Sequence, residues 1–524
     1  MNYIDLLVIA VYVVGFLLLG RIFKDNKSGQ DYFLGGKSFG WFPLSLSTAA
    51  TQLSAISFIS APAFVGLKAG GGMKWLTFEF AVPLAMLFLM VVLIPPMYKA
   101  GIVSVYEYLE KRFGRSTRML LSLVFQISRA FGTGVMVYAV ALILMSVMDI
   151  PMWQTIVLIG IVTLIYSYQG GMKAVVYGDM IQMGILFLGM IVCFGAGLHY
   201  LGGWGEFVAQ VDQERLVAVS FDSWGLEKGD EFGFFPMLIG GFFLYVSYYG
   251  TDQSQVQRLF SAQDMGTVKK TLLSNGLMRF PITLFYCLMG LIIGTFAFSN
   301  TTFLGQIPED KPDLMIPIFI RDYLPHGVIG ILLVAIFSAA MSSLSSAINS
   351  LSAASVEDFF NKNKNLSDYD YMKYSKYTAL FWGLVCLVLA FFTGDIAKTV
   401  IEAINKIGSV FYGPILATFL AAIALPKVNA KGANMGLIAG VLVNLYLWLF
   451  VPEIFWFWWN AIGAVVTLGV GIAGSYVFKT EQTNTEATPG PAFEWDRTKG
   501  LILIGFFVVI VLFSMALPML LGRG

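Results

Sequence analysis

The segment AAMSSLSSAIN, from Ala339 to Asn349, lies inside an apolar run that begins near Val328. Hydrocarbon offers no water to satisfy polar groups, so polar side chains at membrane depth need partners. Helical spacing places four of the polar residues on one face: Ser342, Ser345, Ser346 and Asn349. Small hard cations prefer oxygen ligands. The segment therefore predicts a cation site within a membrane, and with it a transporter.

The composition predicts a polytopic membrane protein. Hydrophobic residues make up 57% of the 524 residues, charged residues make up 12%, and the mean hydropathy is +0.75. Soluble domains carry about 25% charged residues. A net charge of +1 gives no basic surplus for a nucleic-acid partner. The three cysteines, Cys193, Cys287 and Cys386, stand alone in apolar runs and predict small buried side chains. No nucleophile–base pair stands out, so an enzyme is not expected. No obligate protein partner is evident in the sequence.

A spanning helix needs about 20 apolar residues. On that criterion the chain is all-α, with about fourteen transmembrane helices in a single transporter domain, 1–524. The expected spans are 3–21, 41–68, 75–98, 119–147, 151–168, 175–201, 234–255, 271–298, 327–355, 375–393, 397–425, 433–451, 456–478 and 500–521.

The basic residues predict the orientation. Most of the 33 lysines and arginines lie in the loops that follow odd-numbered spans. Loops rich in lysine and arginine stay in the cytoplasm. We therefore expect a protein of the plasma (inner) membrane with both termini outside. The polar segment 480–498 is expected to be a cytoplasmic linker before the last helix.

Two expected spans are unusually polar. The second span carries WFPLSLSTAATQLSAISF over 41–58, and the seventh carries a Gly240-Gly241 pair followed by SYYGTDQ over 247–253. Secondary transporters use discontinuous helices near the bilayer midplane, whose freed carbonyls coordinate Na⁺. The two polar spans are five apart, and an odd offset reverses direction. This spacing predicts an inverted repeat of spans 2–6 (41–201) on spans 7–11 (234–425).

Several ordered motifs resemble a known family. They are Asp31–Lys37 (DYFLGGK), Glu107–Phe113 (EYLEKRF), Gly170–Gln182 (GGMKAVVYGDMIQ), Gln255–Arg258 (QVQR) and the serine helix through Asn349-Ser350. Together they resemble the sodium/solute symporters, which have the LeuT-type fold. The glycine–lysine run resembles the iodide and monocarboxylate branch, and the serine doublets resemble bacterial sialic acid and sugar symporters. The resemblance implies a five-plus-five inverted repeat with flanking helices, and Na⁺ as the coupling ion.

The resemblance implies a sodium site between the second and ninth spans. Its ligands would be the carbonyls of Ala50, Leu53 and Ala339 and the hydroxyls of Ser342 and Ser343. Five oxygens without a formal negative charge suit weak, releasable binding of a small cation. The alternative is that the two serines bond to carbonyls one turn back or provide small packing surfaces.

The resemblance also implies a second sodium site, which would raise the number of coupling ions from one to two. Its ligands would be Asp179, Ser342, Ser345 and Ser346. An intramembrane carboxylate needs a partner. The alternative is that Asp179 caps a helix or pairs with Lys173.

The substrate positions implied by the resemblance lie on five spans. They are Gln52, Ser54, Ser57, Glu79, Tyr245, Arg279 and Lys406, with Tyr248 as an inner aromatic gate. Arg129 is a further candidate, although Gly132 occupies the aligned position of the family's carboxylate-binding arginine. The alternatives are that Arg279 and Lys406 reach an interface, that Glu79 and Arg279 form a structural ion pair, and that Arg129 serves helix packing.

The sequence thus predicts a Na⁺-driven symporter that imports a small polar organic solute by alternating access. Three cations against one carboxylate leave room for an anionic group, so a sugar, a sugar acid or another carboxylate is expected. Monocarboxylate or inorganic-anion symport is the alternative, and proton coupling through Asp179 or a channel is a weaker one. The expected partners are the solute, Na⁺ and the lipid bilayer.

Overall fold

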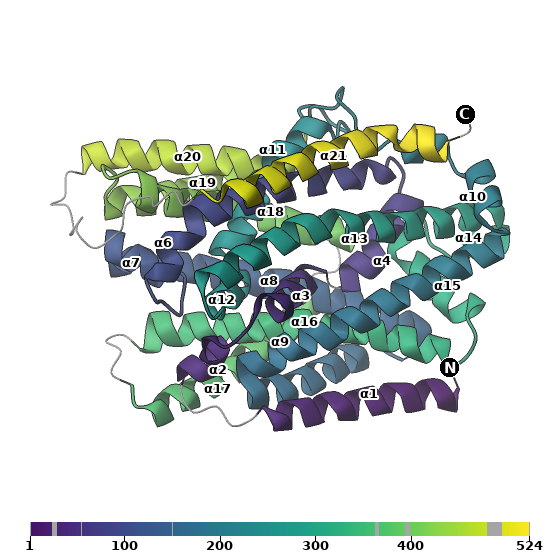
Figure 1. Cartoon of the computed structure of the whole chain (residues 1–524), viewed down its shortest axis with the longest axis horizontal. Coiled ribbons are helices and arrows are strands. Elements are labelled where there is room, and N and C mark those ends of the chain that lie inside the picture. Colours follow the sequence, from purple (N-terminus) through teal and green to yellow (C-terminus); the bar gives the residue numbers. More distant parts are fainter. Residues whose placement is uncertain are drawn as a thin grey trace.

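The computed structural model describes residues 2–23, 29–53, 55–148, 150–361, 366–392, 399–478 and 495–522. In these ranges the regular structure is helical, apart from one isolated bridge between Phe39 and Ala262. The helices run mostly along the long axis of the molecule (Figure 1). Most of the expected linker 480–498 lies outside the described residues.

The elements follow one another without a sheet. They are α1 (Tyr3–Ile22), α2 (Gly29–Leu34), η1 (Gly35–Lys37), α3 (Trp41–Gln52), α4 (Ala55–Gly66), η2 (Met73–Phe80), α5 (Ala81–Phe88), η3 (Leu89–Leu93), α6 (Ile94–Lys99), α7 (Glu107–Phe113), α8 (Arg115–Met148), α9 (Met152–Leu201), α10 (Trp204–Gln210), η4 (Gln213–Leu216), α11 (Phe234–Thr251), α12 (Gln253–Phe260), α13 (Met265–Ser299), α14 (Thr301–Leu304), η5 (Pro312–Leu314), α15 (Met315–Tyr323), α16 (Val328–Ser355), η6 (Val356–Phe360), α17 (Asp368–Ala390), α18 (Val400–Ala424), α19 (Ala430–Phe450), α20 (Phe457–Val477) and α21 (Arg497–Leu521).

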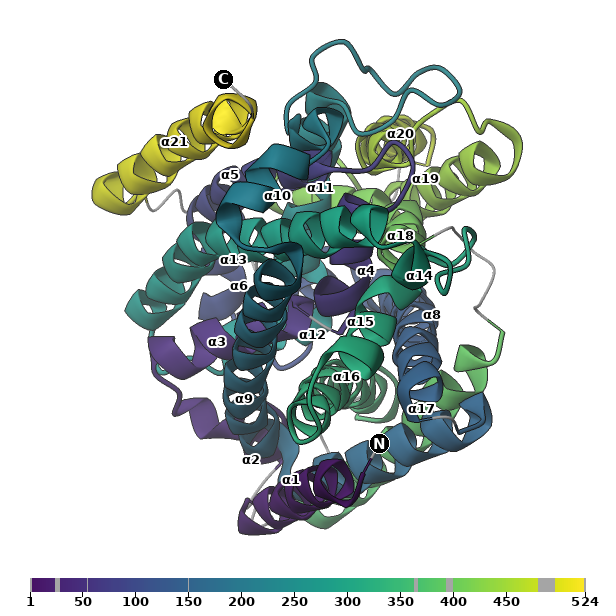
Figure 2. The same ribbon diagram turned by 90° about the vertical axis from the view of Figure 1, so that its right-hand side faces the viewer.

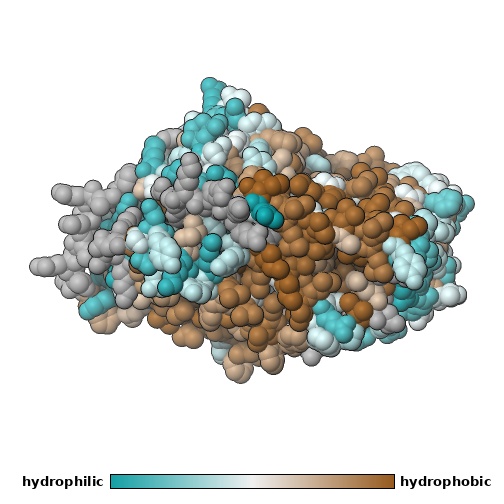
Figure 3. Space-filling model, turned by 90° about the horizontal axis from the view of Figure 1, so that it is seen from below, coloured by the Kyte–Doolittle hydropathy of each residue, from teal (hydrophilic) through white to brown (hydrophobic). Residues whose placement is uncertain are grey.

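Ten helices in the described residues are long and apolar enough to cross a membrane, and the bent pair α3–α4 makes an eleventh. The remaining expected spans, 151–168, 234–255 and 375–393, coincide with the first part of α9, with α11 and with α17. The number fourteen therefore stays a prediction. An apolar surface lies between two polar ends (Figure 3), and both termini lie at one end of the molecule (Figure 1). Which end faces outward also stays a prediction.

The two polar spans are both interrupted. Helix α3 ends at Gln52, Leu53 leaves the helical conformation with φ −82° and ψ 81°, and α4 continues at an angle of 53°. Helix α11 ends at Thr251, and Asp252, with ψ 120°, separates it from α12. A helix end leaves its last carbonyls without helical partners. The carbonyls at these interruptions therefore bond outside their own helices, as where Tyr248 donates to the Thr51 carbonyl and Tyr106 donates to the Thr251 carbonyl. The inverted relation of 41–201 to 234–425 stays a prediction.

Helix α9 is a single run of 50 residues that turns sharply at Gly171, with φ +53° and ψ −150°. A Cβ atom there would lie 2.7 Å from the backbone oxygen of Tyr32, so only glycine fits. This turn separates the fifth and sixth expected spans. It sends the second half of α9 along α16, which lies among α8, α9, α17 and α1 (Figure 2). The serine helix α16 is therefore central and buried along almost its whole length.

Candidate functional site

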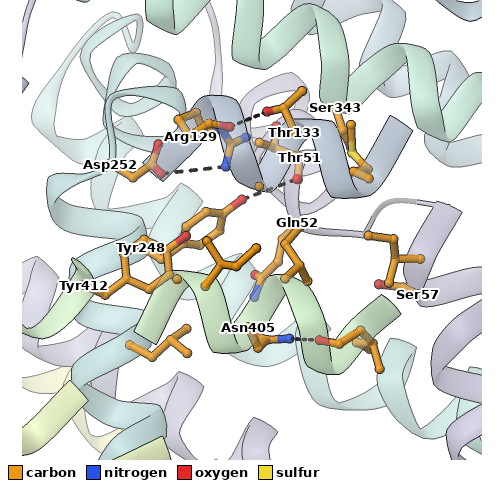
Figure 4. Close-up of a pocket in the computed structure, with 18 of the residues that line it drawn as sticks. Thr51, Gln52, Ser57, Arg129, Thr133, Tyr248, Asp252, Ser343, Asn405 and Tyr412 are labelled. Atoms are coloured by element: carbon orange, nitrogen blue, oxygen red, sulfur yellow. Dashed lines mark hydrogen bonds and ion pairs between the residues drawn. The ribbon is translucent and has the colours of Figure 1, made fainter. Parts of the chain in front are cut away.

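A cavity of about 110 Å³ lies where the α3–α4 break faces α8, α11, α13, α16 and α18 (Figure 4). Its wall combines aromatic rings with polar groups. The aromatic residues are Trp75, Phe78, Tyr248, Tyr286 and Tyr412, and the polar ones include Thr51, Gln52, Ser57, Ser128, Arg129, Thr133, Asp252, Arg279, Ser343 and Asn405. A buried, partly apolar pocket with convergent polar groups is the usual form of a small-molecule site.

Of the five residues expected to hold sodium, Ser343 lies in the lining of this cavity. Ala50, Leu53 and Ala339 are buried beside the α3 break and on the facing turn of α16. The Ser343 hydroxyl lies in the cavity wall, is buried, and has no hydrogen-bond partner among the described residues. It therefore does not bond to the carbonyl one turn back. Ser342 points elsewhere, because its Oγ donates to Asp179 Oδ1 at 2.5 Å.

Asp179 is fully buried on the second half of α9 and already has several partners. It accepts hydrogen bonds from Ser47 Oγ and Ser342 Oγ, each at 2.5 Å, and forms an ion pair with Arg258, whose Nη2 lies 2.9 Å from Oδ2. Lys173 pairs instead with Asp31, at 3.1 Å. The arginine partner was missed from the sequence. The available signal in the sequence was the QVQR motif, which places the charged Arg258 on a short helix that proves to be buried.

Arg279 and Glu79 form a second buried ion pair, with Nε 3.1 Å from Oε2. Arg279 lines the cavity, whereas Glu79 lies behind it. Other atoms of the pair, Glu79 Oε1 and Arg279 Nη1, have no hydrogen-bond partner among the described residues, and neither do the hydroxyls of Tyr245 and Tyr286. The pair thus leaves unsatisfied donors and acceptors at the cavity's edge. The structure thus contains the Glu79–Arg279 ion pair that the sequence analysis gave as the alternative to a substrate role. Glu79 Oε1 and Arg279 Nη1 remain able to form further hydrogen bonds.

Arg129 also faces the cavity, on α8. Its Nη1 lies 3.7 Å from Asp252 Oδ2, and its guanidinium lies 5.9 Å from the centre of the Tyr248 ring (Figure 4). Its Nε has no hydrogen-bond partner among the residues that the structure describes. Asp252 was missed from the sequence. Its other oxygen, Oδ1, accepts from the backbone N–H of Ser254 at 2.8 Å and caps α12. A carboxylate next to an interrupted helix was the available signal.

Five of the expected substrate residues lie in the cavity wall, whereas Glu79, Tyr245 and Lys406 do not. Those in the cavity wall are Gln52, Ser57, Arg129, Tyr248 and Arg279. Tyr245 stacks on Phe78 with ring centres 4.5 Å apart, outside the lining. Lys406 lies over the rings of Trp448 and Trp459, at 5.5 and 5.8 Å, and not in the lining. Ser54 lies outside the described residues.

The expected excess of three cations over one carboxylate around the substrate does not hold in this geometry. Lys406 is packed against tryptophans, Arg279 is paired with Glu79, and Arg129 has Asp252 beside it. Among the described residues, the cavity lining holds Arg129, Arg279 and Asp252, and Glu79 pairs with Arg279. What distinguishes the arginines is their spare N–H groups and not a net positive charge.

Comparison with known proteins identifies the family. The model of the sodium:solute symporter family matches residues 32–440. The chain belongs to the sodium:solute symporter family. It is therefore a Na⁺-coupled transporter of the membrane and not an enzyme.

Curated relatives of this symporter transport different anions. It is 29% identical to the human sodium/iodide cotransporter over 82% of this chain and 67% of the relative. It is 30% identical to sodium-coupled monocarboxylate transporter 1 of Xenopus laevis, over 84% of this chain and 71% of the relative. It is also 30% identical to the bovine (Bos taurus) sodium-coupled monocarboxylate transporter 2, over 84% of this chain and 69% of the relative.

Solved structures agree with this assignment. The fold matches a Na⁺-coupled sialic acid symporter in a substrate-bound outward-open state, with a TM-score of 0.81, 25% identity, and coverage of 91% of this chain and 98% of that one. A nucleobase-cation-symport-1 family transporter matches with a TM-score of 0.56 and 14% identity, over 88% of this chain and 97% of that one. At this identity the match indicates a shared fold alone.

Proposed function

We propose that this symporter imports a small organic carboxylate together with Na⁺, and that the carboxylate binds Arg129. One observation carries the proposal: Arg129 lies in the wall of the cavity, its Nε has no hydrogen-bond partner among the described residues, and its Nη1 lies 3.7 Å from Asp252 Oδ2. A guanidinium presents its donors in a planar fork that suits a carboxylate. The substrate carboxylate would complete the hydrogen bonding that Asp252 leaves incomplete.

The rest of the cavity supports a small solute with an apolar body. Trp75, Phe78 and Tyr286 supply rings, while Gln52 and Asn405 supply amides that suit a hydroxyl or keto group. The volume of about 110 Å³ favours a solute with few heavy atoms over a large sugar acid. The relatives named for monocarboxylate transport point the same way.

Sodium would bind beside this solute, at the Ala50, Leu53, Ala339 and Ser343 oxygens. The Ser342 hydroxyl, which donates to Asp179, would have to turn away from Asp179 to become a further ligand. The unpartnered Ser343 hydroxyl supports this placement. An ion there would tie the interrupted α3–α4 to α16, and so would favour the conformation in which the two lie together. Sodium shifts the conformational equilibrium only by its difference in affinity for the two states. Tyr248, whose hydroxyl donates to the Thr51 carbonyl at 3.4 Å, would cover the solute from one side.

The test is uptake into proteoliposomes with an inward Na⁺ gradient. Labelled lactate, pyruvate and propionate should be taken up, choline in place of Na⁺ should prevent uptake, and a proton gradient alone should not replace Na⁺. A neutral sugar, a sugar acid and iodide are the comparison solutes. Saturable uptake of the sugar or of iodide, with no uptake or competition by the short carboxylates, would contradict the proposed substrate and leave the family assignment intact.

A further inference from the structure

We infer that Arg258 is the resident cation of the Asp179 site, and that this symporter therefore couples to one Na⁺ and not two. The inference rests on the Na⁺ coupling in the proposed function and not on the solute. Arg258 lies on α12, and its side chain is only 2% exposed. A buried arginine needs both a counter-charge and hydrogen-bond acceptors. The question is where its donors go.

The guanidinium of Arg258 is almost fully satisfied. Its Nε donates to Ser47 Oγ at 2.8 Å, and its Nη1 donates to the backbone oxygen of Ser254. Its Nη2 donates to Asp179 Oδ2 at 2.9 Å and to Ser346 Oγ at 2.5 Å. The acceptors come from α3, α12, α9 and α16, so one side chain joins four helices at a single point.

These contacts use the oxygens that a second sodium would need. Two of its four expected ligands, Asp179 and Ser346, contact the guanidinium directly. The hydroxyl of Ser342 donates to the other oxygen of Asp179, and that of Ser345 donates to the Ser342 carbonyl at 3.0 Å. By contrast, the hydroxyl of Ser343, a residue of the cavity lining, has no hydrogen-bond partner in the part of the chain that the structure describes. The Ser343 oxygen is thus without a partner there, whereas the oxygens expected for a second ion are in use.

Charge balance leads to the same conclusion. Asp179 and Arg258 cancel, and adding Na⁺ would bring two positive charges against one negative charge in a buried site. Repulsion between like charges is strong in a low-dielectric interior, and desolvating Na⁺ adds to its cost. Removing the guanidinium reverses the balance, because it leaves a bare carboxylate among serine hydroxyls. That arrangement suits Na⁺.

The experiment counts Na⁺ on purified protein without any solute, by ²²Na⁺ binding at saturation and by the Hill coefficient of a Na⁺ titration. We expect one Na⁺ and a Hill coefficient near one for wild type and for Arg258→Lys, which keeps a cation. Arg258→Met should bind a second Na⁺ at pH 8, with a Hill coefficient above one. The double variant Arg258→Met/Asp179→Asn removes both charges and should return to one.

A wild-type protein that binds two Na⁺, with the double variant binding one, would overturn the inference. So would a folded Arg258→Met protein that still binds one Na⁺ at pH 8. If Arg258→Met does not fold, the wild type and the double variant decide the matter, because equal counts of one support the inference and counts of two and one contradict it. A failed carboxylate uptake assay would not alter these counts.

Discussion

Arg129 and Arg258 both lie within the helical membrane protein, and each has one aspartate nearby, yet their hydrogen bonding differs. Arg258 makes four hydrogen bonds, and its Nη2 lies 2.9 Å from Asp179 Oδ2. Arg129 Nη1 lies 3.7 Å from Asp252 Oδ2, its Nε has no hydrogen-bond partner among the described residues, and the residue lines a cavity. A satisfied arginine stabilises the structure, whereas an arginine with unpartnered donors beside a cavity can bind a ligand. Proximity to an aspartate does not by itself separate the two roles.

The largest expected effect concerns stability. Arg258→Met should lower the free energy of unfolding by about 3–5 kcal/mol in choline buffer, because it leaves Asp179 buried without its counter-charge. Arg129→Met should cost clearly less, since its pair is looser and borders a cavity. Thermal unfolding in detergent compares the two variants. Addition of Na⁺ should narrow the difference in stability from wild type in Arg258→Met and leave that difference unchanged in Arg129→Met. Equal losses of stability in the two variants would contradict the distinction between the two arginines.

The next effect concerns the ion. Ser343→Ala removes the unpartnered hydroxyl and should weaken Na⁺ binding by roughly ten- to a hundredfold, as expected for loss of one contact to a charged group. The fold should persist, because the hydroxyl makes no hydrogen bond in the described protein. The matched control is Ser350→Ala on the same helix, whose hydroxyl donates to the Ala347 carbonyl. Unchanged Na⁺ dependence in Ser343→Ala would place the ion elsewhere.

The solute should respond to Arg129 and not to Lys406. Arg129→Gln should weaken affinity for a short carboxylate by more than about tenfold, the cost of a lost charge-assisted contact. Lys406→Gln is the matched control, because its ammonium lies over Trp448 and Trp459 outside the cavity lining. Competition by unlabelled solute in the uptake assay measures both. A stronger effect of Lys406→Gln would mean that the solute binds on the other side of α18.

The smallest expected effect concerns a buried carboxylate that has no cation beside it in the described contacts. Asp313 lies in η5, outside the apolar helices, and accepts from the backbone N–H of Val400 at 3.0 Å. Burial raises its pKa to about 6, with Ser60 as a hydrogen-bond partner and Glu402 as a nearby negative charge. The folded protein therefore holds a proton that the unfolded chain releases, so stability should fall as pH rises from about 4 to 6.

Asp313→Asn should remove that dependence and raise the unfolding temperature above about pH 6, where the cost of the buried carboxylate is fully present. Thermal unfolding across this pH range measures it. Asp310→Asn, on an exposed neighbour, is the control. If the pH dependence were the same in Asp313→Asn and wild type, its cause would lie in another group. Comparing the stability of this variant with that of a variant at Asp179, which pairs with Arg258, would show how much an arginine partner stabilises a buried aspartate.

Local pattern was enough to predict much of the fold. The polar residues of 41–58 and 247–253 predicted two interrupted helices, and both are interrupted, at Leu53 and Asp252. The spacing of the serines on α16 predicted a polar face, and that face is buried against α9. These features depend on residues close together in the chain, which is why the sequence predicts them.

The partners of charged groups could not be predicted in the same way. Asp179 and Arg258 are 79 residues apart, and Arg279 and Glu79 are 200 apart. Lys406 is one more cation in an apolar span, and nothing in its neighbours predicts two tryptophans at its ammonium. Such pairings depend on which helix faces meet after packing, and a small rotation of one helix would change them.

The sequence by itself determined that this is an all-helical membrane protein with oxygen-rich, interrupted helices, and its motifs indicated a Na⁺-coupled symporter. Hydrophobicity and helical periodicity act over a few turns, so they can be deduced from the chain alone. Only the tertiary structure decided which polar groups have partners. Arg258 pairs with Asp179, whereas Arg129 Nε and the Ser343 hydroxyl, both from residues that line the cavity, have no hydrogen-bond partner among the described residues. The physical reason is that a buried polar group's role depends on whether its hydrogen bonds are already made, and distant segments make them.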